Sequence, residues 1–483
     1  MGVLSNLEPK SVFTYFEEIT RIPHGSGNVE QISNYLVQFA KARNLFCVQD
    51  ELKNVIIVKE ATPGYEKEPT VILQGHMDMV AVKKPDCEID MKTEGLKVAV
   101  RGDEIYAEGT SLGGDDGIAV AYSLALLDSD TIRHPRLEVI ITVDEEVGMD
   151  GARGIDLSML KGSRMVNLDS EDEGIFLTSC AGGARVKCNV PLRVEKRNGV
   201  AYEVIAGGLL GGHSGGEIHK ERGNSNCLFG RLLYRLSAKL PVGLAEGKGG
   251  LADNAIPRET RAVLVIDEKD SAEFASVLDA VEKEIQAELA TKDPGFVIKA
   301  SRLEQGSFSC VTAEDTRKAA AFLISLPGGV QAMSADMPGL VETSLNLGIM
   351  EYQEGSLLAE FSVRSSVESS KYALIDKLCA LTALAGGSNQ VTGDYPGWKY
   401  RKDSPLREKM VALYEKMYGV APKVEAIHAG LECGILGSKI HDLDCVSMGP
   451  QMTAIHTTEE TLSISSTRRV WEYLVALLEE KEA

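Results

Sequence analysis

Residues 71–78 read Val-Ile-Leu-Gln-Gly-His-Met-Asp, an apolar run that ends in an imidazole and a carboxylate. Residues 139–146 repeat the pattern, because Val-Ile-Ile-Thr-Val leads there into three acidic residues. Residues 165–168 are also apolar and precede Asp169. Short apolar runs predict buried strands, and an open α/β sheet gathers its ligands at the carboxyl ends of its strands. These stretches predict an α/β fold whose polar strand ends meet at one site.

Two more residues complete a set of candidate metal ligands. Asp115 lies in a glycine-rich turn at residues 113–117, and His456 lies far downstream. A site for two divalent metals about 3.5–4 Å apart needs at least one shared carboxylate. Asp115 suits the bridging position because glycines let the backbone approach the ions closely. The predicted ligands are His76 and Asp169 for one metal, and Glu146 and His456 for the other.

Two nearby carboxylates remain outside this ligand set. Asp78 lies two residues from His76 and is predicted to point to the same side, where it can accept the second imidazole N–H. Glu145 precedes the ligand Glu146, and a free carboxylate beside a metal-activated water is suited to act as general base. The constellation therefore predicts a metallohydrolase with Glu145 and Asp78 as its catalytic side chains.

Composition narrows the possible partners. The chain has 483 residues, which predicts two domains, and its 44% apolar and 25% charged residues are typical of globular proteins. Its formal net charge of −20 argues against nucleic acid and anionic membranes as partners. No apolar run is long enough to cross a bilayer. Nine dispersed cysteines without a CxxC pair predict reduced thiols and a cytoplasmic location.

The order of predicted elements suggests one domain interrupted by another. Helices and strands alternate at both ends of the chain, which favours a mixed or parallel sheet between helices. The central part combines strands and helices with many turns, which favours an α+β insertion. The predicted division is a catalytic domain formed by residues 1–184 and 394–483, and an inserted domain at residues 185–393.

The ordered motifs resemble those of the M20 family of co-catalytic zinc peptidases over essentially the whole chain. The resemblance implies a di-zinc hydrolase fold, a cis peptide bond between Asp115 and Asp116, and an inserted domain that acts as a lid. It places the family's general base on Glu145, and Asp at position 169 goes with dipeptidase or aminopeptidase activity. It also implies a homodimer. Asp116 departs from the Asn of a well-known family dipeptidase and adds a charge near the metals.

The resemblance further implies substrate-binding residues. His213, in a glycine-rich stretch, is expected to polarise the scissile carbonyl and stabilise the oxyanion. Asn254 and Arg258 flank an Ala-Ile-Pro stretch, and Arg258 can grip the substrate carboxylate as a fork. Glu432 is expected either to bind the free amino group or to serve as a structural carboxylate at a helix start. His219 is either a lid contact or a surface residue.

The resulting expectation is hydrolysis of unblocked dipeptides, of the Xaa-His class including β-Ala-His by resemblance alone. The two metals are expected to be Zn²⁺, with Mn²⁺ or Co²⁺ as alternatives, because His and carboxylate ligands accept all three. Two other chemistries of the family are N-acyl amino acid deacylation and tripeptide cleavage. A non-catalytic binding module and a zinc-storage protein are the alternatives from other classes, and the intact Glu145 argues against the former.

Overall fold

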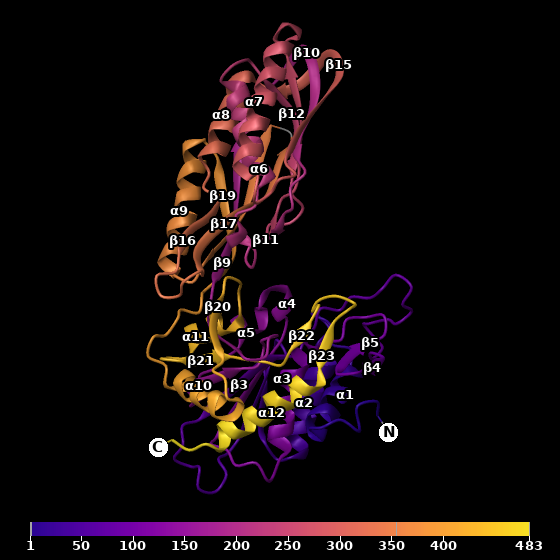
Figure 1. The fold of residues 1–483 in the computed structure, drawn as a ribbon, viewed down its shortest axis with the longest axis vertical. Helices are drawn as coiled ribbons and strands as arrows, with labels where there is room; N and C mark the ends of the chain where they lie inside the picture. Colours follow the sequence, from indigo (N-terminus) through magenta and orange to yellow (C-terminus); the bar gives the residue numbers. More distant parts are fainter. Residues whose placement is uncertain (1, 354, 483) are drawn as a thin grey trace. The chain divides into compact units, whose positions relative to one another are not determined.

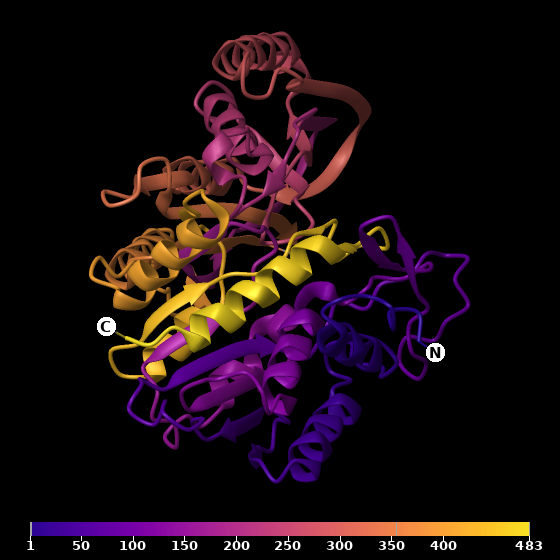
Figure 2. The same ribbon diagram turned by 60° about the horizontal axis from the view of Figure 1, so that its bottom comes forward.

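A computed structural model describes residues 2–353 and 355–482, which form two compact units (Figure 1). Unit 1 contains the chain up to Ser179, Tyr400–Ala426 and the part from Leu431 onward. Unit 2 contains Cys180–Lys399 and Ile427–Gly430. The described N-terminal and C-terminal segments therefore belong to unit 1, and Figure 2 shows the C-terminal helix, in yellow, within the same unit as the N-terminal segments, in indigo and purple.

The centre of unit 1 is an eight-stranded mixed sheet in the order β1-β2-β6-β3-β7-β21-β8-β20. Its four central strands are parallel, because β3 pairs in parallel with β6 and β7, and β7 pairs in parallel with β21. The strands are β1 (Phe46–Gln49), β2 (Val55–Lys59), β3 (Val71–His76), β6 (Leu137–Thr142), β7 (Arg164–Asn167), β8 (Ile175–Cys180), β20 (Lys423–Ile427) and β21 (Asp444–Ser447). Their parallel direction brings four carboxyl ends to one edge.

Helices cover the sheet of unit 1. Its longer helices are α1 (Lys10–Thr20), α2 (Glu30–Ala42), α3 (Gly114–Asp128), α10 (Pro405–Tyr418) and α12 (Ile464–Glu479). Shorter ones are α4 (Glu145–Gly148), α5 (Asp150–Gly154) and α11 (Glu432–Lys439). Every residue of α3 from Gly114 to Leu127 is buried, which fits its apolar sequence. Tyr122 of α3 stacks on Trp471 of α12, so the N- and C-terminal segments share one core.

A small four-stranded sheet lies in the same unit, in the order β22-β23-β5-β4. Its strands are β4 (Val98–Arg101), β5 (Glu104–Ala107), β22 (Met452–Thr453) and β23 (Thr461–Ser463). Because β23 pairs antiparallel with both β22 and β5, this sheet joins the C-terminal loop around residue 456 to an early segment of the chain.

Unit 2 is built on a second sheet, in the order β15-β10-β14-β12-β17-β18-β9-β19, with β16 paired to β17. The strands are β9 (Gly182–Pro191), β10 (Val194–Gly207), β12 (Gly243–Gly249), β14 (Thr260–Ile266), β15 (Val297–Val311), β16 (Gly329–Met333), β17 (Val341–Gln353), β18 (Ser356–Ser365) and β19 (Ser388–Tyr395). All their recorded pairings are antiparallel. This is the α+β character that the sequence predicts for the central part.

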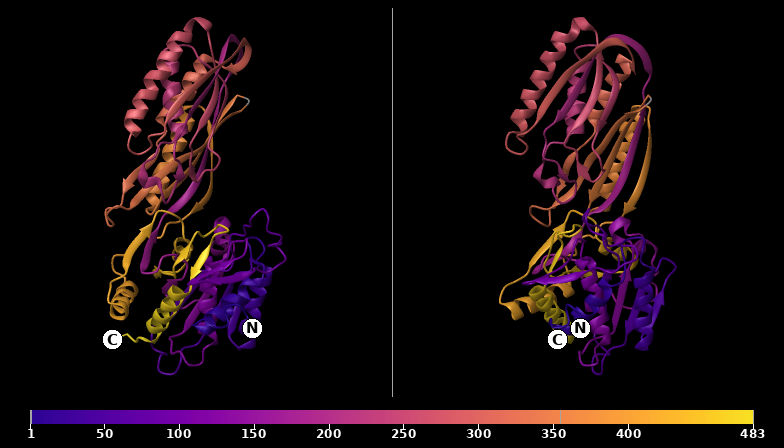
Figure 3. Two further views of the ribbon diagram at one scale, coloured as in Figure 1. Left: turned by 45° about the vertical axis from the view of Figure 1, so that its right-hand side comes forward. Right: turned by 90° about the vertical axis from the view of Figure 1, so that its right-hand side faces the viewer.

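Four helices cover one face of this sheet, as Figure 3 shows. They are α6 (Ser225–Ser237), α7 (Ser271–Leu289), α8 (Ala313–Ser325) and α9 (Glu368–Leu384). Their buried residues share one core with alternate residues of the strands, such as Leu264 and Ile266 of β14. A two-stranded ladder of β11 (Gly212–His213) and β13 (Ala255–Ile256) and two short 3₁₀ helices, η1 (Ile218–Lys220) and η2 (Glu268–Asp270), complete the unit.

The predicted glycine-rich turn at residues 113–117 overlaps the start of a helix. The helix α3 begins at Gly114 and includes Asp115 and Asp116 with non-helical backbone angles. As the resemblance implies, the peptide bond between these two residues is cis. Among the residues that the structure describes, no helix is both long and apolar enough to cross a membrane.

Candidate active site

The polar strand ends of unit 1 converge as the strand directions predict. His76 ends β3, Glu145 and Glu146 begin α4 just after β6, and Asp169 follows β7 by two residues. His456 lies in the loop between β22 and β23. Three of the four parallel strands, β3, β6 and β7, thus deliver these side chains to the same edge of the sheet.

Asp115 lies between the two imidazoles. Its Oδ1 is 3.2 Å from His76 Nε2, and its Oδ2 is 3.1 Å from His456 Nε2. Each carboxylate oxygen therefore faces a different histidine, which is how a carboxylate bridges two metals. His76 Nε2 also lies 3.6 Å from Asp169 Oδ1, and His456 Nε2 lies 2.8 Å from Glu146 Oε1.

These separations suit metal coordination. Two donors that each lie about 2.0–2.1 Å from one tetrahedral zinc are about 3.3–3.4 Å from each other. The four distances between imidazole nitrogens and carboxylate oxygens, 2.8–3.6 Å, lie on either side of that value. Ligand atoms of Asp115, Glu146 and His456 all lie within 4.8 Å of one another, as do those of His76, Glu145 and Glu146. The donor set of two imidazoles and several carboxylates fits two divalent ions.

The electrostatics of the cluster favour bound cations. Burial lowers the pKa of His76, but the carboxylates of Asp169, Asp115 and Asp78 outweigh burial and raise it well above its usual value. Hydrogen bonds to Asp115 and Glu146 raise the pKa of His456 to about 10. The carboxylates therefore attract positive charge to both imidazole nitrogens, and a dication can take the place of each proton.

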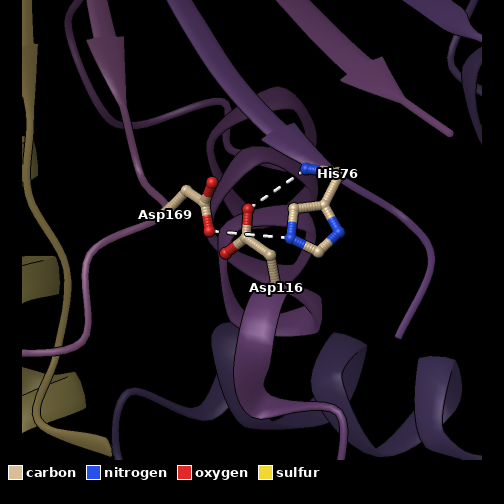
Figure 4. Close-up of side chains that lie close together, drawn as sticks. All are labelled: His76, Asp116 and Asp169. Carbon is tan, nitrogen blue, oxygen red and sulfur yellow. Dashed lines mark hydrogen bonds and ion pairs between the residues drawn. The ribbon is translucent and has the colours of Figure 1, made fainter. Parts of the chain in front are cut away.

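Asp116 belongs to the same cluster. Figure 4 shows its carboxylate beside His76 and Asp169, and its ligand atoms lie within 4.8 Å of theirs. Its Oδ2 accepts the backbone N–H of His76 at 3.1 Å. Burial raises the pKa of Asp116 well above its usual value. Burial therefore disfavours the negative charge that Asp116, in place of Asn, is expected to add near the metals.

Asp78 links three parts of the site. Its Oδ1 accepts the backbone N–H of Glu145 at 3.1 Å, and its Oδ2 accepts the hydroxyl of Ser26 at 2.8 Å. The second imidazole nitrogen of His76 lies 2.9 Å from the backbone oxygen of Asp78 and 3.4 Å from its carboxylate. The shorter contact of the imidazole is therefore with the main chain, while the carboxylate connects His76 to the start of α4.

Glu145 lies on α4 beside Glu146. Burial raises the pKa of Glu145 well above its usual value, and the nearby carboxylates of Asp169, Glu432 and Glu146 raise it further. A raised pKa favours the protonated form of Glu145. A carboxylate that accepts a proton and later donates it must be able to reach that form.

A buried line of polar side chains lies behind these residues. Glu432 is fully buried, and its Oε2 accepts hydrogen bonds from Gln74 Nε2 at 2.6 Å and Thr142 Oγ1 at 2.5 Å. Gln74 in turn accepts a hydrogen bond from Asn167 Nδ2 at 2.5 Å. These hydrogen bonds connect α11 to β3, β6 and β7 near the strand ends that precede the candidate ligands. Burial raises the pKa of Glu432 to about 8.

The three substrate-binding candidates of unit 2 lie close together. The β11–β13 ladder pairs His213 with Ala255, and the backbone N–H of Ser214 donates to the oxygen of Asn254 at 2.8 Å. Arg258 follows β13 by two residues and lies against Gly211, where an added Cβ would be 2.6 Å from Arg258 Cγ. The side chains of His213, Asn254 and Arg258 are all exposed.

The ring of His213 is held by its own turn. Its Nδ1 accepts the backbone N–H groups of Gly215 at 3.3 Å and Gly216 at 3.0 Å. An accepting Nδ1 places the imidazole proton on Nε2, which leaves Nε2–H as a donor. Partial desolvation of the exposed ring lowers the pKa of His213, and the positive charge of Arg364 lowers it further, which favours the neutral ring. Arg364, on β18, is a nearby residue that sequence reasoning did not single out.

The comparisons with known proteins agree with this architecture. The model of peptidase family M20/M25/M40 matches residues 72–480. The chain belongs to this family. It is 34% identical over 482 residues to the cytosol non-specific dipeptidase of Escherichia coli (strain K12), covering 99% of both chains.

Solved structures of relatives share the fold. The crystal structure of aminoacylhistidine dipeptidase from Vibrio alginolyticus superimposes with a TM-score of 0.92 at 34% identity, covering 99% of each chain. An aminopeptidase from Bacillus cereus superimposes with a TM-score of 0.55 at 16% identity, covering 98% of each chain, which shows a common fold alone. The M20 resemblance and the α/β fold class predicted from the sequence are thereby confirmed.

Proposed function

We propose that this M20 protein is a metal-dependent dipeptidase that hydrolyses unblocked dipeptides, including Xaa-His and β-Ala-His. The observation that carries the proposal is the position of Asp115, whose two oxygens face two different imidazoles at 3.2 and 3.1 Å. The full-length similarity to a non-specific dipeptidase and to an aminoacylhistidine dipeptidase supports the choice of dipeptides as substrates.

The proposed metals are two Zn²⁺ ions, with Mn²⁺ or Co²⁺ as alternatives. His76 and Asp169 would hold one ion, Glu146 and His456 the other, and Asp115 both. When bound, the ions would supply a nucleophilic water near neutral pH and polarise the peptide carbonyl. Three carboxylates and one hydroxide balance the charge of two dications, so a neutral cluster can be buried at tolerable cost.

The proton transfers are assigned to Glu145. Its carboxylate accepts a proton from the attacking water and then donates this proton to the leaving amine. Asp78 holds the backbone N–H of Glu145 at 3.1 Å and thereby fixes where α4 begins. Burial and the nearby carboxylates raise the pKa of Glu145, which favours the protonated form that must donate to the amine.

The substrate contacts are assigned to unit 2 and to Glu432. His213 Nε2–H is proposed to donate to the developing oxyanion, Arg258 to bind the substrate carboxylate, and Asn254 to orient the peptide. Glu432 is proposed to bind the free amino group, although its present partners, Gln74 and Thr142, equally suit a structural role. Residues 185–393 are proposed to form a lid domain, and residues 1–184 and 394–483 the catalytic domain.

The protein is further proposed to act in the cytoplasm as a homodimer, without nucleic-acid or membrane partners. The cytosol dipeptidase of Escherichia coli supports the location, and the net charge of −20 supports the lack of polyanionic partners.

A small substrate panel tests the function. Purified protein loaded with Zn²⁺ or Mn²⁺ is offered β-Ala-His, Gly-His, Ala-Ala, N-acetyl-His and Gly-Gly-His, and amine release is measured with and without chelator. Cleavage of only the unblocked dipeptides, lost with chelator, is the expected result. Cleavage of N-acetyl-His alone would indicate a deacylase, and cleavage of Gly-Gly-His alone a tripeptidase. No cleavage despite two bound metals would support a binding module.

A further inference from the structure

The carboxylate of Glu460 is enclosed by four backbone N–H groups. Its Oε2 accepts from Leu112 at 2.8 Å and Gly113 at 3.1 Å, and its Oε1 accepts from Gly114 at 2.8 Å and Asp115 at 3.4 Å. The side chain is only 3% exposed. A buried carboxylate at the start of a helix, here α3, both satisfies free N–H groups and interacts favourably with the helix dipole.

The turn around this carboxylate is the one that carries Asp115. Gly113 has a φ of 70°, which favours glycine. A Cβ added at Gly114 would lie 3.3 Å from Glu460 Oε1 and 3.1 Å from Met452 Sδ. The turn is therefore closely fitted to Glu460, and the backbone of Asp115 itself is one of the four donors.

Glu460 also belongs to the loop that carries the other imidazole. His456 lies four residues earlier, and the backbone N–H of Glu460 donates to Thr457 O at 3.4 Å. Ala454 and His456 have φ values of 51° and 61°, so the loop contains two non-glycine residues in the left-handed region. Such backbone angles persist only where the surrounding structure fixes them.

We propose that Glu460 is a positioning residue of the dinuclear site. Its carboxylate fixes the Leu112–Asp115 turn to the loop of His456, so that Asp115 presents one oxygen to each imidazole. The inference rests on the proposed function, because it assigns Glu460 a part in holding the metals of that site. The competing explanation is that Glu460 stabilises the fold without affecting the ligands.

The Glu460→Gln variant separates these explanations. Glutamine has the same shape but only one acceptor oxygen, and its NH₂ group would face backbone N–H donors. At least one pair of N–H groups then loses its acceptor, and the turn must shift. Glu459→Gln is the matched control, because Glu459 is adjacent, exposed, and paired with Lys84 at the surface. Glu460→Asp keeps the charge on a shorter side chain and serves as the conservative variant.

The measurement is a Co²⁺ titration of the full-length, metal-free protein, followed by its visible absorption spectrum and by metal content. Far-UV circular dichroism verifies that each variant is folded at the temperature used. We expect Glu460→Gln to bind Co²⁺ about 10–100-fold more weakly, with an altered spectrum, and Glu460→Asp to be intermediate. Dipeptide kinetics should show a lower kcat with KM within twofold of the parent. Glu459→Gln should match the parent throughout.

Unchanged metal binding in the variants would overturn the inference about Glu460. If Glu460→Gln is less stable but binds two Co²⁺ ions with the parent's affinity and spectrum, Glu460 has only a structural role and the inference is wrong. If Glu460→Gln does not fold, parent-like Co²⁺ binding by Glu460→Asp overturns the inference, and weakened binding supports it. A parent protein that binds Co²⁺ but cleaves no dipeptide would contradict the proposed function, while the Co²⁺ titrations would still decide the role of Glu460.

Discussion

The two regions with candidate functional residues are built differently. In unit 1, three of the five candidate ligands, His76, Glu146 and Asp169, lie at the ends of parallel strands, and carboxylates and imidazoles are 2.8–3.6 Å apart. In unit 2, His213, Asn254 and Arg258 sit on a two-stranded ladder and are exposed. Parallel strand ends give fixed positions to groups that must hold ions, whereas an exposed turn suits groups that meet a substrate from solvent. Changes to the candidate ligands of the first region should therefore abolish metal binding, and changes in the second should affect turnover alone.

The largest effect is expected from Asp115→Ala. The variant removes the carboxylate that faces both imidazoles, so both metals should be lost and dipeptide turnover should fall to the background rate. Metal content by mass spectrometry and amine release from Ala-Ala measure the two quantities. The exposed Asp86→Ala serves as the control. Retention of both metals at the parent's affinity would contradict the bridging role.

The next effect is expected from Glu145→Gln, which keeps the shape of the side chain but removes its ability to accept a proton. We expect kcat to fall about 10²–10⁴-fold, with both metals retained, because general base catalysis contributes that much. Glu51→Gln, at an exposed position, is the comparison. Loss of metal in Glu145→Gln would instead indicate that Glu145 is a ligand.

A smaller effect is expected from His213→Ala in unit 2. Removing one donor to an oxyanion costs about 10²–10³-fold in kcat, and metal content should not change. His219→Ala is the matched control, because His219 is an exposed histidine of the same segment. If both variants lose the same activity, the assignment to His213 is wrong. If His213→Ala loses metal, the assignment of metal binding to unit 1 and of substrate contacts to unit 2 is wrong.

The smallest expected effect is a decrease in the free energy of unfolding at acidic pH. Burial, with the nearby Arg364 cation, lowers the pKa of His428 from its usual 6.5 to about 4. Between those values the unfolded chain binds the proton and the folded protein does not, so stability falls as pH falls from 6.5 to 4. The full shift corresponds to at most about 3 kcal/mol.

A variant isolates this contribution from other titrating groups. The free energy of unfolding of the parent should decrease more steeply than that of His428→Gln between pH 6.5 and 4, as measured by urea denaturation. His428 Nε2 lies 2.7 Å from Ser344 Oγ, and glutamine can retain this hydrogen bond. Parallel pH profiles for the two proteins would show that His428 does not titrate differently on folding.

Much of unit 1 could be predicted from the sequence because its signals are local. The strands β3, β6, β7 and β21 contain short apolar runs, and their alternation with helices favours the mixed or parallel sheet that the sequence predicts. Four of the five candidate ligands follow such a run or lie in a glycine-rich turn, whereas His456 lies in the loop between β22 and β23. Their roles remain predictions, but the structure brings together all five predicted metal ligands.

The residues that sequence reasoning missed are those whose partners are distant in the chain. Glu460 lies 345 residues from Asp115, whose N–H it accepts, and Ser26 lies 52 residues from Asp78. The residues around Glu460 do not indicate that its carboxylate accepts backbone N–H groups, and those around Ser26 do not indicate that its hydroxyl donates to Asp78. The long strand β15 also lacked a signal, because most of its residues are exposed and do not alternate between polar and apolar.

The wide separation of the candidate ligands along the chain has a consequence for biosynthesis. His456 lies 287 residues after Asp169 (456 minus 169). At a translation rate of about 5–20 residues per second, roughly 15–60 s pass between the synthesis of these two residues. A growing chain thus holds most of the ligands long before the last imidazole exists. The complete set of candidate ligands can therefore form only after residue 456 has been synthesised.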